Sequence, residues 1–208
     1  PFRMSREDGE KVVQRVKDAI FNRSVATSDY EFYDMLKMNP IDKQALVEKH
    51  LISPNLVGGR IASAAIISKD EKVSIMINEE DHLRIQCLFP GLQLDKAWEL
   101  CDKIDSLLEE NIDYSFSEKY GYLTCCPTNL GTGIRASAML HLPALTMTGY
   151  IRGMLDVCGK LGIAVRGIYG ENSEALGNLF QISNQITLGQ SEEEIINNIT
   201  NIGNQIIN

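Results

Sequence analysis

Apolar residues recur at helical spacing near the start of the chain. The positions are Val12, Val13, Val16, Ala19 and Ile20. Ser5, with Asp8 three residues after it, resembles a capping box in front of this stretch. The pattern therefore predicts a helix over residues 5–22.

Two further stretches in the first half of the chain have the same period. Asn39 and Pro40 are a good N-cap and first-turn pair for a helix that continues through Glu48. A long amphipathic helix is predicted over residues 93–111, where Asp105 interrupts the apolar face. The first half of the chain therefore contains three predicted helices.

The second half contains two more helical stretches. Residues 144–162 have a helical pattern, and residues 191–208 close the sequence with another. Ser191 precedes the last helix and Glu194 stands at its third position, which is the arrangement of a capping box.

Other runs combine apolar and β-branched residues and predict strands. They cover residues 60–68, 72–78, 82–89, 121–125, 163–169 and 178–188. Only the short polar stretches "KDE" and "EED" separate the first three runs. Such connections suit antiparallel neighbours, because parallel strands need a crossover of about a dozen residues or more. The predicted fold is α+β, with a mainly antiparallel β-sheet packed with helices.

Composition restricts the class of protein. The 208 residues are 44% hydrophobic and 23% charged, which is typical of one globular domain or one with a small appendage. A formal net charge of −8 argues against a nucleic-acid or anionic-membrane binder, because an acidic surface gains nothing from polyanions. Any anion site must therefore be built locally from a few arginines.

Cysteine use and the absence of long apolar runs indicate the compartment. The five cysteines have no C-x-x-C spacing, so they predict neither a disulfide framework nor a zinc site, and no other group has metal-ligand spacing. A reducing cytoplasm fits this composition. The sequence has no signal-peptide core and no apolar run of about 18 residues, so a soluble protein is expected.

The run "CCPTNLGTG" over Cys125–Gly133 is the first candidate for chemistry. A plain Gly-rich turn is one interpretation, and a loop in an active site is another. Cys126 precedes a proline at the mouth of this loop. A free cysteine is commonly a small core residue, whereas a reactive thiolate needs a cationic neighbour, for which Arg135 is a candidate.

A nucleotide-binding glycine motif is the remaining interpretation of this loop. Gly131–Ala136 fits the pattern G-x-G-x-x-A of dinucleotide-binding folds. Pro127 and Asn129 precede it and Pro143 soon follows, so the strand–turn–helix context that the motif needs is not expected. The lysine of a phosphate-binding P-loop is also missing.

Charged residues follow two apolar strands. "NEEDHLR" places Glu80 and Arg84 at one turn, and "VRGIYGE" places Arg166 and Glu171 at another. Alternation would put Glu80, His82 and Arg84 on one face if the second strand starts early. Solvated turns would explain both runs. With Arg135, however, three arginines at the ends of apolar segments could bind phosphate in one cleft, while the carboxylates bind a basic substrate.

Three segments together resemble the ATP:guanidino phosphotransferases, the family of arginine and creatine kinases. They are "NEEDHLRIQCLFPG", "CPTNLGTGIRAS" and "RGIYGENSE". The resemblance implies a guanidino kinase catalytic domain with a glutamine synthetase-like fold, extending over residues 1–208 and truncated at both ends. In the family, a segment S-x-R-x-R binds phosphate and normally lies just upstream of the position where "PFRMS" begins. The two phosphate-binding arginines of that segment are therefore not in this sequence.

Within the family, the closest likeness is to the bacterial protein-arginine kinases. "LHLPAL", "GIYGE" and "GNLFQISNQITLG" are similar to theirs. Small-molecule arginine kinases usually carry His where Met139 stands and Arg where Tyr169 stands, and this difference favours a protein substrate.

The resemblance implies a role for each candidate residue. Glu80 matches the carboxylate that deprotonates the guanidinium, Glu171 the carboxylate that aligns it, and Cys126 the cysteine beside its nitrogen. The ATP phosphates would be bound by Arg84, Arg135 and Arg166. Two interpretations apply to His50: a helix-end residue that complements the helix dipole, or, by the resemblance, a nucleotide-contacting histidine.

The predicted function is Mg²⁺- and ATP-dependent phosphorylation of arginine side chains in proteins. The resemblance adds a bacterial chaperone-protease and a heat-shock repressor as partners in a stress response, and a homodimer of the full-length protein. The alternatives are a free-arginine kinase and a nucleotide- or arginine-binding module without catalysis.

Overall fold

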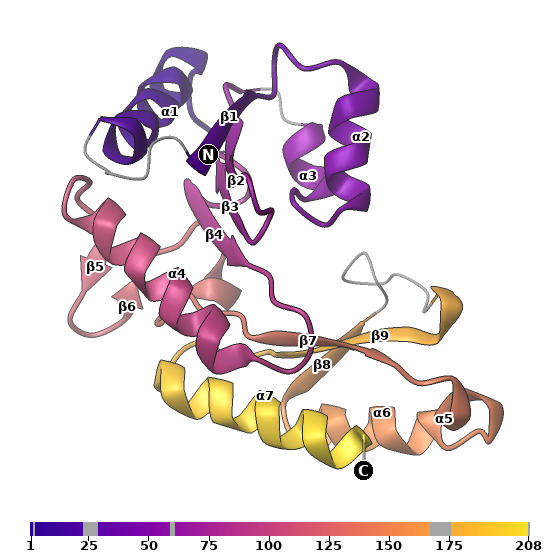
Figure 1. Cartoon of the computed structure of the whole chain (residues 1–208). Helices are drawn as coiled ribbons and strands as arrows, with labels where there is room; N and C mark the ends of the chain where they lie inside the picture. Colours follow the sequence, from indigo (N-terminus) through magenta and orange to yellow (C-terminus); the bar gives the residue numbers. More distant parts are fainter. Residues whose placement is uncertain (2, 23–28, 59–60, 167–175, 208) are drawn as a thin grey trace. The chain divides into compact units, whose positions relative to one another are not determined.

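The computed structural model describes residues 1, 3–22, 29–58, 61–166 and 176–207. It divides the chain into two units, Pro1–Ser115 and Phe116–Asn208 (Figure 1). Each unit has its own antiparallel sheet, so the predicted α+β class is confirmed.

The sheet of the first unit is a meander in which sequence neighbours pair. Its strands are β1 (Tyr30–Asp34), β2 (Ala64–Ser68), β3 (Val73–Ile77) and β4 (Leu83–Cys87), in that order and all antiparallel. Every residue of β2 and β3 is buried, as expected for central strands that helices cover on both faces. The predicted antiparallel pairing of the three runs is confirmed, whereas β1 was not predicted.

Helices cover both faces of this sheet (Figure 1). On one face, α1 (Arg6–Phe21) and α4 (Leu94–Glu109) bury residues against Ile66 and Ile75. On the other face, α2 (Pro40–Glu48) and α3 (Pro54–Val57) pack against Ile67 and Met76. The strand alternation of side chains therefore divides the apolar core into two layers.

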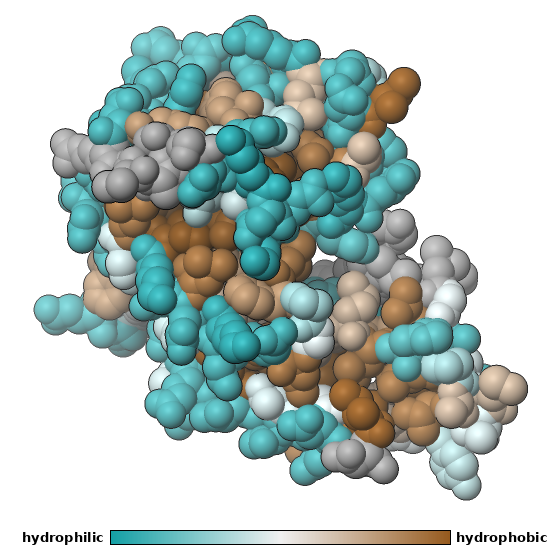
Figure 2. All heavy atoms as spheres, viewed as in Figure 1, coloured by the Kyte–Doolittle hydropathy of each residue, from teal (hydrophilic) through white to brown (hydrophobic). Residues whose placement is uncertain are grey.

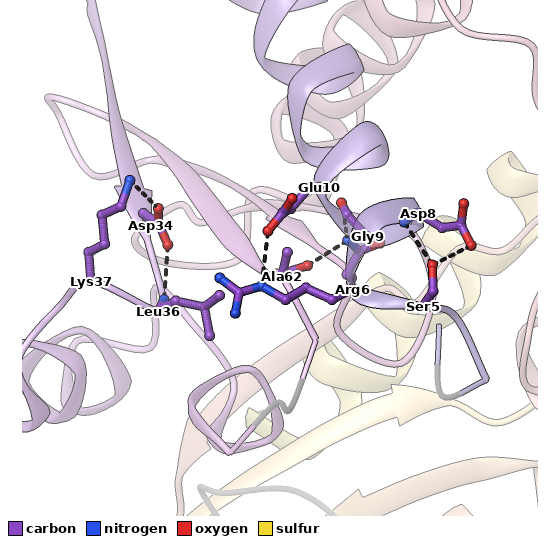
Figure 3. Close-up of polar contacts among 10 residues, drawn as sticks. Ser5, Arg6, Asp8, Gly9, Glu10, Asp34, Leu36, Lys37 and Ala62 are labelled. Atoms are coloured by element: carbon purple, nitrogen blue, oxygen red, sulfur yellow. Dashed lines mark hydrogen bonds and ion pairs between the residues drawn. The ribbon is translucent and has the colours of Figure 1, made fainter.

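The starts of α1 and α2 are those that the sequence predicts, whereas α3 was not predicted. The Ser5 hydroxyl accepts a hydrogen bond from the Asp8 N–H at 3.1 Å (Figure 3), and Asn39 caps α2 in the same way. Gly9 of α1 lies against Ala62, where an added Cβ would meet the Ala62 oxygen at 3.3 Å (Figure 3). The first turn of α1 therefore sits directly on the chain that leads into β2.

The sheet of the second unit has its last strand in the middle. Its order is β7 (Ser137–His141), β9 (Leu179–Asn184), β8 (Ile163–Arg166), with β9 antiparallel to both neighbours. Helix α7 (Glu192–Ile207) packs on β7 and β9, and α6 (Ile151–Lys160) packs on β8. A short hairpin, β5 (Phe116–Ser117) and β6 (Gly121–Tyr122), precedes this sheet.

Three predictions for the second unit need correction. The single helix expected over 144–162 is two helices, α5 (Pro143–Met147) and α6, because Gly149 takes a left-handed conformation with φ of 77° between them. The strand expected over 121–125 keeps only its first two residues, in β6. β7 was not predicted as a strand.

Polar residues cover most of the outer surface over α1 and α2, whereas apolar residues reach the surface over α5 and α6 (Figure 2). The exposed apolar side chains there include Met147, Tyr150, Val157 and Leu161. None of the helices in the described ranges is both long and apolar enough to cross a membrane.

Candidate active site

The turn between β3 and β4 carries the first group of candidate residues. Asn78 begins it in a left-handed conformation with φ of 58°, and its N–H donates to the His82 oxygen at 3.0 Å. Its buried side-chain amide donates to the backbone oxygens of Gly9 and Ala62 at 3.1 and 2.7 Å. The turn is therefore fixed to α1 and to the chain before β2.

The acids of this turn differ in burial, a difference that the sequence does not reveal. Glu79 is buried, accepts a hydrogen bond from the Ser53 hydroxyl at 2.6 Å, and lies 3.6 Å from Nη1 of Arg84. The Glu79 side chain is 2% exposed and that of Arg84 is 47% exposed. Glu80 is half-buried. Sequence reasoning selected Glu80 and missed Glu79, whose only sequence signal is its place in a run of three acids.

Glu80, His82 and Arg84 would share one strand face only if the second strand started early, and it does not, because β4 begins at Leu83. Arg84 lies in β4 opposite Met76, whereas Glu80 and His82 belong to the turn. Nε2 of His82 is 3.0 Å from the Met4 sulfur, and partial burial lowers the pKa of this imidazole.

His50 is connected to the strand that carries Arg84. It follows α2 in a left-handed conformation with φ of 58°, and its side chain is exposed. Its carbonyl oxygen accepts a hydrogen bond from Nε2 of Gln86 at 2.6 Å, two residues along β4 from Arg84. His50, Glu80 and Arg84 thus all belong to the first unit, around β4 and its turn.

The loop after β6 carries the candidate cysteine of the second unit. Cys126 is half-buried and precedes a short 3₁₀ turn, Pro127–Asn129. Its sulfur lies 3.0 Å from the Thr128 hydroxyl oxygen, within hydrogen-bond distance, and its carbonyl oxygen accepts from the Thr124 hydroxyl at 2.6 Å. The thiol thus has a polar partner in its own loop.

The chain after this loop enters a strand, and this excludes the dinucleotide motif. Residues Ser137–His141 form β7 where that motif would require a helix. Gly131 instead serves close backbone packing, because its φ is 106° and an added Cβ would lie 2.5 Å from the Thr187 oxygen. The Gly-rich run is therefore a tight loop between strands.

Two arginines lie in or next to the sheet that follows. Arg135 is exposed just before β7, and Arg166 is half-buried as the last residue of β8. In the register, Met139 of β7 lies opposite Gln181 of β9, which lies opposite Arg166. Met139 is 44% exposed. Facing side chains in a sheet share a face, so Met139 and Arg166 project from the same side.

The remaining predicted residue, Glu171, lies outside the described residues. Within the part of the chain that the structure describes, no group of three or more His, Cys, Asp or Glu side chains could hold a metal ion. Cys126, Arg135 and Arg166 belong to the second unit, as Glu80 and Arg84 belong to the first.

Residues 11–208 match the family described as ATP:guanido phosphotransferase, C-terminal catalytic domain. The chain belongs to this family, and the resemblance seen in its motifs is confirmed.

Relatives and solved structures agree with this family. The protein-arginine kinase of Caldanaerobacter subterraneus subsp. tengcongensis is 57% identical over 208 residues, which are 100% of this chain and 62% of that protein. The protein-arginine kinase of Pelotomaculum thermopropionicum is 53% identical over 100% of this chain and 59% of its own length. The chain thus spans about three-fifths of the relatives that it matches.

Among solved structures, the duplicated taurocyamine kinase from Schistosoma mansoni with bound transition state analog components superposes with a TM-score of 0.88. It is 26% identical, and the match covers 98% of this chain and 30% of that one. A lombricine kinase gives a TM-score of 0.82 at 25% identity over 98% of this chain and 59% of that chain.

Proposed function

We propose that the chain is the catalytic part of a protein-arginine kinase, which transfers the γ-phosphoryl group of ATP to arginine side chains of proteins. The observation that carries the proposal is the identity of 57% over the whole chain to a protein with that name. Family membership supports the reaction class, and the high identity supports the substrate class.

The chemistry of arginine explains the proposed role of the carboxylates. A guanidinium group has a pKa above about 12 and is a poor nucleophile until it loses a proton. Glu80 is proposed to accept that proton, and Glu171 to align the group. Cys126 is proposed to lie beside the reacting nitrogen, where a thiolate would add negative charge without forming a covalent bond.

The arginines are proposed to bind the phosphates. The phosphoryl group in transfer carries spread negative charge, and its transfer is accelerated mainly by alignment and charge stabilisation. The positive side chains of Arg84, Arg135 and Arg166 would stabilise the negative charge of the ATP phosphates. His50 would contact the nucleotide. Mg²⁺ enters as part of the Mg–ATP substrate, whose phosphate oxygens it neutralises when bound.

A protein is the proposed substrate in preference to free arginine. Met139 stands where small-molecule arginine kinases usually carry His, and it is exposed on the sheet face that carries Arg166. A thioether offers no charge or strong hydrogen bond to a small polar substrate. A cytoplasmic location, a chaperone-protease, a heat-shock repressor and a homodimer remain part of the same proposal.

The test is phosphorylation by the full-length gene product. We expect acid-labile phosphate on the arginines of an unfolded basic protein after incubation with Mg–ATP, and none on free arginine. Glu80→Gln should reduce kcat by about a hundredfold or more, because it removes the proton acceptor. Glu99→Gln is the matched control, since Glu99 is exposed in α4. Phosphate on free arginine alone, or full turnover by Glu80→Gln, would refute the proposal.

A further inference from the structure

Two buried polar side chains contact the loop that carries Cys126 and Arg135, here called the cysteine loop (residues 126–136). Asn184 is the last residue of β9, and Thr187 follows three residues later. They are 5% and 4% exposed. Burying a polar group costs free energy unless the group is hydrogen-bonded. The hydrogen-bond partners of Asn184 and Thr187 therefore show which part of the chain these two side chains stabilise.

Asn184 binds the peptide groups on both sides of Arg135. Its Oδ1 accepts a hydrogen bond from the Ala136 N–H at 2.9 Å, and its Nδ2 donates to the Ile134 oxygen at 3.0 Å. The same Nδ2 also donates to the Ile186 oxygen at 3.1 Å. One side-chain amide therefore fixes the backbone from which the exposed Arg135 side chain projects.

Thr187 binds the other half of the loop. Its hydroxyl lies 3.0 Å from the Thr128 oxygen and 2.7 Å from the Leu130 oxygen, so one proton is shared between two carbonyl groups. Its own carbonyl oxygen accepts from both the N–H and the hydroxyl of Thr132, each at 3.1 Å. Thr128 is the residue whose hydroxyl contacts the Cys126 sulfur.

These contacts reach the loop backbone at residues that adjoin the candidate site residues. A loop of this kind moves unless it is held, and a misplacement of about 1 Å at a reacting group can lower a rate about a hundredfold. An apolar side chain could fill the same space without hydrogen bonds to the carbonyl groups of the loop. Gly131 completes the contact, since only a residue without Cβ permits the approach to the Thr187 oxygen.

We propose that Asn184 and Thr187 are positioning residues of the phosphoryl-transfer site: Asn184 orients Arg135 toward its phosphate, and Thr187 holds the Thr128–Cys126 pair. This inference rests on the proposed function, which makes Cys126 and Arg135 site residues. Both side chains are buried and bind the backbone of the cysteine loop, so each is proposed to act through that backbone.

The first test compares Thr187→Val with Thr187→Ser. Valine keeps the shape of threonine and loses the hydroxyl, whereas serine keeps the hydroxyl. The rate of Cys126 alkylation by iodoacetamide is measured against pH in a Cys125→Ser background, because the adjacent Cys125 is exposed. We expect Thr187→Val to shift this pH profile and to lower kcat about tenfold while the KM for ATP changes less than about twofold. Thr187→Ser should restore both.

The second test separates the role of Asn184. Asn184→Ala should raise the KM for ATP about tenfold, because Arg135 loses its fixed backbone, and should leave the Cys126 profile nearly unchanged. Thr200→Val is the matched control: Thr200 lies in α7, and its buried hydroxyl has no hydrogen-bond partner among the described residues. This variant should leave kcat, KM and the alkylation profile unchanged.

The outcomes distinguish this inference from the proposed function. If Thr187→Val and Asn184→Ala lower only the thermal stability and keep the kinetic constants and the alkylation profile, the two residues are structural and the inference is overturned. If the unsubstituted protein phosphorylates no arginine, the proposed function fails. The alkylation profile then still decides whether Thr187 controls the environment of Cys126, and an unshifted profile in Thr187→Val overturns the inference.

Discussion

At the residue scale, Glu79 and Glu80 show how neighbours of the same type acquire different environments. Glu79 is buried with a hydroxyl and a guanidinium beside it, whereas Glu80 is half-buried in the turn. A carboxylate inside a protein is costly unless it is hydrogen-bonded or paired, and Ser53 and Arg84 meet that need. Ser53 is the N-cap of α3, so Glu79 connects the start of α3 to Arg84 of β4.

This connection predicts the effect of Glu79→Gln on nucleotide binding. The amide keeps the size of the side chain but removes the charge beside Arg84. We expect the Kd for Mg–ATP, measured by titration calorimetry, to rise about three- to tenfold, because the half-exposed guanidinium loses the carboxylate that orients it. Glu99→Gln should leave the Kd unchanged. An unaltered Kd in Glu79→Gln would show that Arg84 is oriented without Glu79.

The residue-level predictions from sequence succeed where a local motif places the side chain. Glu80 and Arg84 are predicted to lie at one turn because only three residues separate them; Glu80 does lie in that turn, and Arg84 is the second residue of β4, directly after it. The roles of Asn184 and Thr187 could not be predicted, because their partners stand about fifty residues earlier in the chain. Buried polar residues near a strand end carry no sequence signal for such partners.

At the element scale, the capping box of α7 permits a stability prediction. The Ser191 hydroxyl accepts from the Glu194 N–H at 3.2 Å, and Glu194 Oε2 accepts from the Ser191 N–H at 2.8 Å. Ser191→Ala should lower the free energy of unfolding by about 1 kcal/mol in urea denaturation, because one N–H of the first turn loses its acceptor. Ser106→Ala, at an exposed interior position of α4, should change it by only a few tenths of a kcal/mol.

A second prediction at this scale concerns Gly131 in the cysteine loop. Gly131→Ala should destabilise the protein by several kcal/mol or prevent its folding, because the new Cβ would clash with the Thr187 carbonyl. Gly153→Ala is the same substitution inside α6, where no atom lies within 4 Å of the added Cβ. That variant should be more stable by about 1 kcal/mol. Equal melting temperatures for the two variants would contradict the packing at Gly131.

Elements with local signals are predictable, and elements defined by distant partners are less so. The helices with caps at Ser5, Asn39 and Ser191 begin where the sequence indicates. β7 was missed because its register is set by β9, about forty residues later. The single helix expected over 144–162 failed because one glycine, Gly149, is compatible with a helical pattern but takes the left-handed conformation that ends it.

At the scale of the whole molecule, Asp105 makes stability depend on pH. It interrupts the apolar face of α4, as the sequence pattern indicated, and accepts a hydrogen bond from the Tyr114 hydroxyl at 3.1 Å. Burial raises the pKa of this carboxyl above its ordinary value of 3.8, against the opposing effect of Tyr114. The folded state therefore binds this proton more tightly than the unfolded state does, so the contribution of Asp105 to stability falls as pH rises through the folded pKa.

The prediction is that Asp105→Asn stabilises the protein at neutral pH. The amide removes the half-buried charge and can still accept a hydrogen bond from the Tyr114 hydroxyl. The gain in melting temperature should vanish in acid below the pKa of an unfolded aspartate, where Asp105 is protonated in both states. Asp102→Asn, at an exposed position one turn earlier, should show much less of this pH dependence. A constant gain at all pH values would mean that desolvation of the carboxylate is not its cause.

For the whole molecule, the sequence predicts the fold class and the direction in which the strands pair. Hydrophobic periods and three-residue connections sufficed for an antiparallel α+β fold. The expectation that residues of distant segments share one cleft depends on contacts that no local pattern encodes, and it stays a prediction. Glu80 in one unit and Cys126 in the other are the residues that would test it by cross-linking with a substrate analogue.

The strand orders of the two sheets have a consequence for synthesis on the ribosome. In the first unit each strand pairs with the one made just before it, so β1 to β4 can form their sheet as they emerge. In the second unit β7 and β8 must wait for β9, which is translated last of the three and joins both. A nascent chain stalled before β9 would hold a folded first unit and two strands with open edges, which makes this interval the period when the growing polypeptide most needs protection from aggregation.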